Sequence, residues 1–173
     1  MLLFNYNKCY YLILNSFFNP SGFMRSSIIK YMFCYLVDEI DFDEKRLKKF
    51  GYEMGRIMLV LYNFQEEKEI QFLLYKITYS LLPYFYETTR NLEVKNSETG
   101  TFLLVENEGL FSKNISLPEN ETFCCDSIIA GAIEMFLKSA SFDSEVTAHN
   151  CPSDEQPYRV IYEIKIKNVI KIE

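Results

Sequence analysis

The spacing of apolar residues predicts three helices in the first half of the chain. After an Asn-Pro-Ser-Gly breaker at 19–22, residues 23–40 are apolar on every side of a helix. Residues 44–64 carry one apolar stripe at helical spacing, which is typical of a helix that packs on a core. A similar stripe over residues 67–82 stops at Pro83, because proline ends most helices. We therefore expect one helix that is buried on all sides and two ordinary core helices.

Two pairs of residues add detail to the helix predicted over 44–64. Asp41 and Asp43 precede it and offer a carboxylate cap for its first N–H groups. Gly51 and Gly55 lie four residues apart on one side, and each costs about 1 kcal/mol relative to alanine in a helix. The sequence therefore predicts that another backbone approaches closely at the two glycines, since such a contact would compensate this cost.

In the second half of the chain, the spacing of apolar residues changes from that of helices to that of strands. Strands are predicted at 92–94 and 101–106, a helix at 124–140, and two further strands at 145–149 and 158–164. This order is that of an α+β fold. We expect N-terminal helices to pack on one face of a small four-stranded antiparallel sheet, with a further helix between the two strand pairs.

The all-apolar helix predicted over 23–40 indicates a protein partner. A helix without a polar face must be buried all round, and so small a protein has too little material to cover it. We therefore expect a second chain to cover one of its faces. The residues predicted to form this interface are Ile28, Tyr31, Met32, Tyr35 and Leu36.

The composition fits one folded domain with an arm. The chain has 173 residues, of which 49% are apolar and 16% aromatic, so a sizeable core is expected. We assign residues 21–173 to a single domain and residues 1–20 to an N-terminal arm. Asn and Lys residues interrupt the apolar run of the arm, which argues against a targeting signal. No segment approaches the ~20 consecutive apolar residues of a membrane span.

The charge balance argues against a nucleic-acid partner. Eighteen Lys and Arg residues against 24 Asp and Glu residues give a formal net charge of −6. Such a chain has no overall attraction to a phosphate backbone, and no long basic cluster offsets this. We expect no binding to nucleic acid.

The five cysteines and the single histidine limit the chemistry that the chain can support. The cysteines lack C-x-x-C spacing, and His149 has no second histidine beside it, so no zinc-type ligand set is expected. Neither a Gly-rich phosphate loop nor a nucleophile elbow occurs. The sequence therefore predicts no catalytic residue, no metal and no cofactor.

Two adjacent cysteines at the start of the helix predicted over 124–140 leave one chemical alternative open. A helix N-terminus lowers the pKa of a thiol and can make Cys124 or Cys125 nucleophilic. Asp126 opposes thiolate formation, and Cys125 lies on the apolar stripe of the helix. We favour a packing role for both thiols and keep a thiol enzyme as the alternative.

The polar side of the same helix carries two further signals. Glu134 and Lys138 are four residues apart, which predicts an ion pair along the helix. Gly131 lies among these polar residues and predicts a close approach by another element.

The region around this helix resembles a known family. The stretch N-E-T-F-C-C-D-S-I-I-A-G-A-I-E-M-F-L at 120–137 and the stretch S-F-D-S-E-V-T-A-H at 141–149 are similar to the TRAPP (transport protein particle) component family, in particular to its subunit five type. T-F-L-L-V-E-N-E at 101–108 matches as well. The motif positions are Cys125, Ser127, Ala130, Gly131, Glu134, Val146, Thr147, Ala148 and His149.

The resemblance implies a TRAPP-component fold and a role as a non-catalytic core subunit. In this family, paralogous subunits form heterodimers through their first helices, and the dimers line up into an elongated complex. That complex tethers vesicles in endoplasmic-reticulum-to-Golgi transport and promotes guanine-nucleotide exchange on a Rab GTPase. The implied location is cytoplasmic and peripheral at endoplasmic-reticulum and cis-Golgi membranes, with membrane contact only through the complex.

The resemblance also implies an alternative function, a module that binds a small apolar ligand. Phe72, Tyr75 and Tyr79 of the helix predicted over 67–82 are candidates to line its pocket, although their helical spacing favours filling of the core. A related subunit carries an acylated cysteine before its third helix. This chain has Glu66-Glu67-Lys68 there, so acylation is not expected.

Overall fold

A computed structural model of the chain describes residues 36–37, 39–65, 67–86, 88–96, 100–114 and 123–169. The predicted N-terminal arm and most of the helix predicted over 23–40 lie outside the described residues, and so do Ile28, Tyr31, Met32 and Tyr35. Of that helix, Leu36 packs half-buried against the core, and Val37 is buried in it. No helix within the described part is long and apolar enough to span a membrane.

The order of elements is that of the predicted α+β fold. Helices precede a pair of strands, and a further helix separates this pair from two final strands. The elements are α3 (Glu44–Tyr62), α4 (Ile70–Lys76), the π-helix η1 (Ile77–Leu81), α5 (Leu82–Tyr86), β1 (Asn91–Asn96), β2 (Thr101–Glu106), the 3-10 helix η2 (Ser112–Asn114), α6 (Ser127–Ser139), β3 (Phe142–Asn150) and β4 (Val160–Val169).

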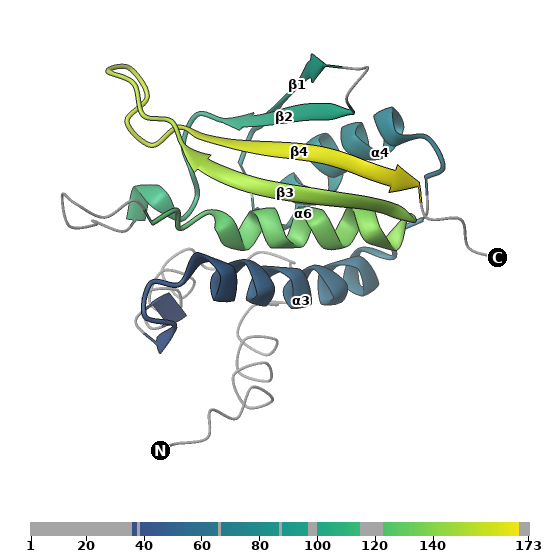
Figure 1. Cartoon of the computed structure of the whole chain (residues 1–173), viewed down its shortest axis with the longest axis horizontal. Coiled ribbons are helices and arrows are strands. Elements are labelled where there is room, and N and C mark those ends of the chain that lie inside the picture. Colours follow the sequence, from purple (N-terminus) through teal and green to yellow (C-terminus); the bar gives the residue numbers. More distant parts are fainter. Residues whose placement is uncertain are drawn as a thin grey trace.

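The four strands form one antiparallel sheet in the order β1-β2-β4-β3. In Figure 1, α6 runs along the β3 side of the sheet and α3 lies beyond α6. Buried and exposed residues alternate along β3, so one face of the sheet meets the helices and the other is open. On the open face, Lys165 pairs with Glu163 at 2.9 Å and Lys167 with Glu145 at 3.0 Å. The predicted fold class is confirmed.

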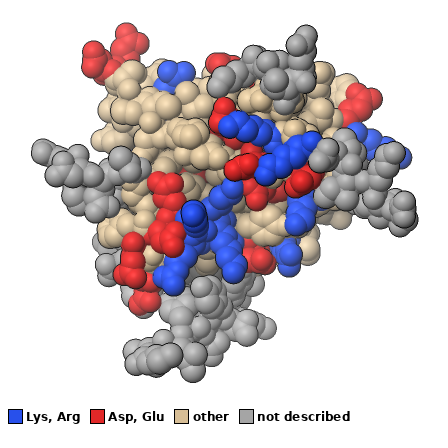
Figure 2. Space-filling model, in the orientation of Figure 1, with Lys and Arg blue, Asp and Glu red and all other residues tan. Residues whose placement is uncertain are grey.

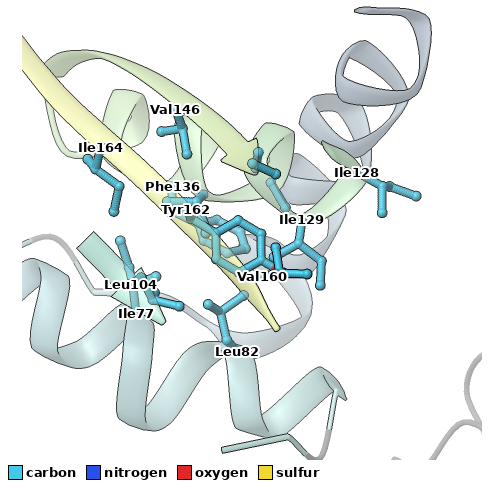
Figure 3. Packing of buried hydrophobic residues seen from close by; sticks show 14 of the residues in the cluster. Ile77, Leu82, Leu104, Ile128, Ile129, Phe136, Val146, Val160, Tyr162 and Ile164 are labelled. Carbon is cyan, nitrogen blue, oxygen red and sulfur yellow. The ribbon is translucent and has the colours of Figure 1, made fainter. Parts of the chain in front are cut away.

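The core lies between the inner face of the sheet and the helices. Tyr162 of β4 is fully buried at its centre. Figure 3 shows its ring surrounded by Phe136 and Ile129 from α6, Leu104 from β2 and Leu82 from α5. Such a core needs apolar residues every second position in a strand, and the sequence supplies them.

The N-terminus of α3 confirms the predicted cap. One carboxylate oxygen of Asp43 accepts hydrogen bonds from the backbone N–H groups of Lys45, at 2.9 Å, and Arg46, at 3.3 Å. The helix ends at Tyr62, where Asn63 takes a left-handed conformation with φ of 52°. Left-handed residues of this kind commonly end helices.

The prediction that the third helix stops at Pro83 is wrong. Helical structure begins at Ile70 and continues through η1 to Tyr86. In η1 the Leu82 N–H bonds to the carbonyl of Ile77, five residues back, so this turn is wider than an α-helical one. Pro83 is the second residue of α5, directly after this wider turn, and a missing N–H is tolerated in the first turn of a helix.

β3 and β4 are each longer than predicted at the end where they pair with each other. β2 has its predicted bounds, whereas β3 begins at Phe142 and β4 continues to Val169. Phe142 and Val169 are partners in the strand register, so each extension provides the backbone neighbour of the other. The ends of two paired strands therefore cannot be predicted from the residues of one strand alone.

The α3–α6 contact confirms the close approach predicted at the glycines. A Cβ added to Gly51 would lie 1.8 Å from the carbonyl oxygen of Ile128, and one added to Gly131 would lie 1.9 Å from that of Lys48. A Cβ on Gly55 would lie 3.1 Å from the Cα of Ala132. The helices therefore touch backbone to backbone, which only residues without a side chain permit.

We expect Gly131→Ala to lower the free energy of unfolding by about 3 kcal/mol or more, because the added methyl overlaps a backbone carbonyl that cannot move aside. Denaturant unfolding measures the loss. Gly55→Ala is the matched control and should cost less, since its contacts of 3.0–3.1 Å need smaller shifts. Without a close contact, alanine at position 131 would instead stabilise the helix by about 1 kcal/mol, and that sign would contradict the contact.

Candidate functional site

The family motif lies on α6 and β3 and mainly packs the core. Cys125, Ala130 and Gly131 are buried at the contacts of α6 with its neighbours. Val146 and Ala148 point inward from β3, and Ser127 is buried at the start of α6. Thr147 and His149 are exposed on the open face of the sheet. The structure thus brings the motif residues of the two elements together as packing partners.

Both cysteines at the start of α6 are buried. Cys124 is 3% exposed and Cys125 is 1% exposed. Burial raises the pKa of the Cys124 thiol well above its usual value, and the Asp126 carboxylate adds to this. His149 is on the open face of the sheet, with Nε2 3.9 Å from a Glu163 oxygen, so it is not placed to act as a base. These features favour the packing role over thiol chemistry.

Asp126 holds the segment after β2 against the start of α6. Its carboxylate accepts hydrogen bonds from the backbone N–H of Phe111, at 3.1 Å, and of Ser112, at 3.0 Å, and from the Ser112 hydroxyl. It is fully buried, and burial raises its pKa. Gly109 lets the two segments meet, since a Cβ there would lie 2.8 Å from Asp126 Oδ2.

A buried ion pair joins Arg90, just before β1, to Glu106 at the end of β2. Arg90 Nε and Nη2 donate to the two Glu106 oxygens at 2.9 and 3.1 Å, and the Tyr162 hydroxyl donates to Glu106 at 2.9 Å. Arg90 is 2% exposed and Glu106 is 1% exposed. Desolvation raises the pKa of Glu106, although Arg90 opposes this. All three side chains are committed to one another inside the core.

This cluster was not predicted from the sequence, although β2 contains a signal for it. Phe102, Leu104 and Glu106 occupy alternate positions of β2, so the carboxylate follows two inward-facing apolar residues. A charged residue in phase with a buried face needs a partner of opposite charge. The partner was not predictable, because Arg90 is 16 residues away and lies outside the strand.

Glu134 pairs with α3 and β3, and the ion pair predicted with Lys138 is wrong. Glu134 Oε2 lies 2.7 Å from Lys48 Nζ and accepts the Val146 N–H at 3.1 Å. Lys138 instead lies with its Nζ 5.8 Å from the centre of the Tyr52 ring. The α3–α6 contact brings Lys48 into reach of Glu134. Glu134 thereby satisfies a backbone donor on the outer edge of β3, which protects that edge from pairing with another chain.

The aromatic residues of α4 and η1 face outward. Phe72 is 62% exposed, Tyr75 60% and Tyr79 44%. The prediction that these rings fill the core is wrong, and their exposure weakens the alternative that they line a pocket. Leu73, Leu74 and Ile77 take the inward positions of this helix instead. The Tyr79 hydroxyl accepts the Leu92 N–H at 3.3 Å, so the ring lies against β1, the other edge of the sheet.

Among the described residues, no group of three or more His, Cys, Asp or Glu side chains is arranged to hold a metal ion. In the core, Glu106 pairs with Arg90, Asp126 accepts backbone N–H groups, and the thiols of Cys124 and Cys125 are buried.

Comparisons with known proteins agree with this architecture. A model of the family described as transport protein particle (TRAPP) component matches residues 22–167. A protein of Encephalitozoon cuniculi named putative trafficking protein particle complex subunit TRS31 is 38% identical over 143 residues, covering 80% of this chain and 98% of that protein. Human trafficking protein particle complex subunit 5 is 39% identical over 66 residues, covering 38% of this chain and 35% of that protein.

Solved structures show the same fold at low sequence identity. Subunit 3 of the trafficking protein particle complex of Naegleria fowleri, covalently bound to palmitic acid, has a TM-score of 0.73 at 17% identity, covering 85% of this chain and 98% of that one. An unliganded Fe(II) H-NOX protein of K. algicida has a TM-score of 0.57 at 12% identity, covering 99% and 92%.

The family match and the names of the sequence relatives indicate a subunit of a vesicle-trafficking complex. The chain belongs to the TRAPP component family, because the family model spans nearly all of it. Its similarity to proteins named TRS31 and subunit 5 places it with the subunit 5 type. The resemblance seen in the sequence is confirmed.

We expect Cys124 and Cys125 to resist alkylation in the folded chain. Their burial and the raised pKa of Cys124 keep the thiol neutral near pH 7, and only the thiolate attacks iodoacetamide. Peptide mass spectrometry after timed labelling should show both sites reacting far more slowly than free cysteine. The half-buried Cys151 is the internal control and should react faster. Labelling of Cys124 as fast as free cysteine would restore the thiol-enzyme alternative.

We expect Arg90→Met to lower the free energy of unfolding by about 3–5 kcal/mol, because it leaves the Glu106 charge buried without its partner. The double variant Arg90→Met/Glu106→Leu removes both charges and should recover much of this loss. Denaturant unfolding of the single and double variants measures the coupling between them. Additive losses would contradict a buried ion pair.

Proposed function

We propose that the chain is a non-catalytic core subunit of the TRAPP vesicle-tethering complex. In this proposal it acts in endoplasmic-reticulum-to-Golgi transport and contributes structurally to guanine-nucleotide exchange on a Rab GTPase. The observation that carries the proposal is the family match over residues 22–167, together with coverage of 98% of a relative named TRS31. We further propose a cytoplasmic location, peripheral at endoplasmic-reticulum and cis-Golgi membranes.

The non-catalytic part of the proposal rests on what the reactive side chains do. Cys124, Cys125 and Asp126 are buried at the start of α6, and Glu106 is paired with Arg90 in the core. Nucleotide exchange needs no acid, base or nucleophile, because a surface that binds the nucleotide-free GTPase better than the bound form is sufficient. A subunit can therefore contribute to exchange by shaping such a surface.

We propose that a paralogous subunit pairs with this chain through the all-apolar helix predicted over 23–40. Apolar side chains left exposed in the last turn of α3 support a protein partner for this domain: Val60 is 80% exposed and Leu61 is 44% exposed. Contact with the GTPase, and contact with a membrane, would both be made through the assembled complex. Binding of the GTPase through the complex does not require a basic surface on this chain.

The alternative of an apolar-ligand module has weaker support in this chain. The N. fowleri subunit is covalently bound to palmitic acid, but residues 66–68 of this chain contain no cysteine. The rings of Phe72, Tyr75 and Tyr79, which the alternative needed, are exposed. A lipid retained in native mass spectra of the purified chain would bring this alternative back.

The interface is tested by Tyr35→Asp, which places a charge on the predicted apolar contact. We expect the variant to lose co-purification with its paralogous partner, and the assembled complex to lose at least about tenfold in exchange rate, because a buried unpaired charge is costly. Tyr158→Asp is the matched control at an exposed site, where the native side chain is 47% exposed, and should leave both unchanged. Normal pairing and exchange with Tyr35→Asp would contradict the proposed interface.

A further inference from the structure

The two edges of the sheet are protected to different extents. At the β3 edge, the Glu134 carboxylate accepts the Val146 N–H at 3.1 Å, and α6 runs along this side of the sheet. At the opposite edge, Figure 1 shows no strand beyond β1, and none of the described strands pairs with β1 on that side. β1 therefore offers a backbone edge to which a further strand can be added.

The hydrogen bond of Leu92 shows which backbone groups of β1 point outward. Its N–H donates to the Tyr79 hydroxyl at 3.3 Å and so points away from β2. Backbone groups alternate between the two sides of a strand, so the N–H and C=O groups of Val94 point outward as well. Among the described residues, only the Tyr79 hydroxyl bonds to these groups. Its bond is long, and a carbonyl of an added strand can replace it at little cost.

α4 and η1 supply an aromatic wall beside this edge. Phe72, Tyr75 and Tyr79 are exposed and follow one another at helical spacing, and the centres of the Tyr75 and Tyr79 rings are 4.7 Å apart. Lys76, which adjoins this aromatic stripe, lies 3.5 Å from Glu67 and is thereby engaged. Because Tyr79 reaches Leu92, the uncharged stripe and the β1 edge form one continuous surface.

The outer side of β1 adds a charge to this surface. Glu93 alternates with Leu92, so it lies on the side of the sheet away from the helices, and it is exposed. Elsewhere on the open face, Lys165 and Lys167 pair with carboxylates of the sheet, and Figure 2 shows basic and acidic side chains lying next to one another. A strand added beside β1 brings one residue next to Glu93, and a Lys or Arg there forms a favourable cross-strand pair.

The same carboxylate argues against a second copy of this chain as the added strand. An antiparallel register that uses the outward groups of both Leu92 and Val94 places these two residues opposite each other across the two copies. Glu93 of one copy then lies directly opposite Glu93 of the other. Like charges in this position are destabilising, so a strand from a different protein fits better.

We propose that the β1 edge and the aromatic stripe of α4 and η1 form a docking site for an extended segment of a different protein. The segment adds to the four-stranded sheet beside β1, and its backbone bonds to the outward groups of Leu92 and Val94. Its side chains toward the helix are apolar and lie on Tyr75 and Tyr79, and a basic side chain on its other side lies beside Glu93. In strand addition, main-chain bonds give affinity and alternate side chains give specificity. The site is separate from the predicted first-helix interface, so this inference goes beyond the proposed function and does not depend on it.

The experiment titrates a fluorescein-labelled, amidated peptide of sequence KVTVKVT with the full-length chain and reads fluorescence anisotropy. This peptide alternates apolar residues with lysine and threonine, as the site requires. Hydrogen-exchange mass spectrometry of the chain with and without the peptide should show slower exchange over residues 91–96 and no change over residues 142–150. The peptide KKTTVVV has the same composition without the alternation and should bind about tenfold more weakly or less. Equal binding of the two peptides would overturn the proposal in favour of nonspecific attraction.

Two N-methylated forms of KVTVKVT test the backbone pairing itself. One carries methyl groups on the three valine amides, and the other carries them on the amides of both threonines and the second lysine. Only one of these sets can face β1, because the N–H groups of a strand alternate between its sides. We expect one form to bind within about threefold of the parent peptide and the other to lose about tenfold or more. Equal losses in both forms, or no loss in either, would overturn strand addition.

Variants of Tyr79 separate the ring from its hydroxyl. Tyr79→Phe keeps the aromatic surface and frees the Leu92 N–H, so we expect the affinity for KVTVKVT to stay the same or rise. Tyr79→Ala removes the surface and should weaken binding by about tenfold. The native side chain is exposed, so both variants should keep the melting temperature of the native chain within a few degrees. A loss in Tyr79→Phe as large as that in Tyr79→Ala would overturn the role of the free edge.

Glu93→Lys tests the charge requirement and should weaken binding of KVTVKVT by about tenfold. Glu145→Lys makes the same change at an exposed site on β3 and should leave binding nearly unchanged. Self-association of the chain that slows exchange over residues 91–96 without any peptide would overturn the proposal in favour of a second copy. Binding of phosphatidylcholine vesicles through the aromatic stripe, without binding of the peptide, would overturn it in favour of a lipid surface.

Discussion

The backbone contact between α3 and α6 is the constraint on which the rest of the structure depends. Gly51 and Gly131 each face a carbonyl of the other helix at a distance that leaves no room for a methyl group. This approach brings Lys48 to Glu134, and Glu134 in turn holds the outer edge of β3. It also lets Glu44, in the first turn of α3, accept the Cys124 N–H at 2.6 Å, which joins the starts of the two helices. Most motif residues of α6 are therefore explained by the close packing of this helix against its neighbours.

The reactive side chains of the described core serve this packing. The charges of Arg90 and Glu106 are paired, and Asp126 binds backbone N–H groups. These side chains are thus occupied in holding the core together, and the surfaces of the domain remain to make contacts with other molecules. Those surfaces differ in kind: exposed apolar residues on α3, aromatic rings on α4 and η1, and the unpaired backbone edge of β1. Several distinct contact surfaces on one small domain are expected of a subunit in an extended assembly.

Patterns within one element were predictable from the sequence, and pairings between elements were not. The Asp43 cap and the bounds of β2 follow from local residues and were predicted, and so was the need for a close contact at Gly51 and Gly55. The sequence did not show that α6 is the neighbour at these glycines, nor that Lys48 pairs with Glu134. The rings of Phe72 and Tyr75 were misplaced because α4 and η1 carry apolar residues on both sides, and the inward face is set by Leu73 and Ile77. The continuation past Pro83 depends on the wider turn of η1, for which the sequence has no simple signal.

We propose that a paralogous subunit completes this chain. Light-scattering mass of the purified chain, alone and co-expressed with each paralogous subunit of its own organism, is the measurement to make first. We expect a 1:1 complex with one of them and self-association of the lone chain, because an all-apolar helix is then left uncovered. A well-behaved monomer that binds none of the paralogous subunits would contradict it.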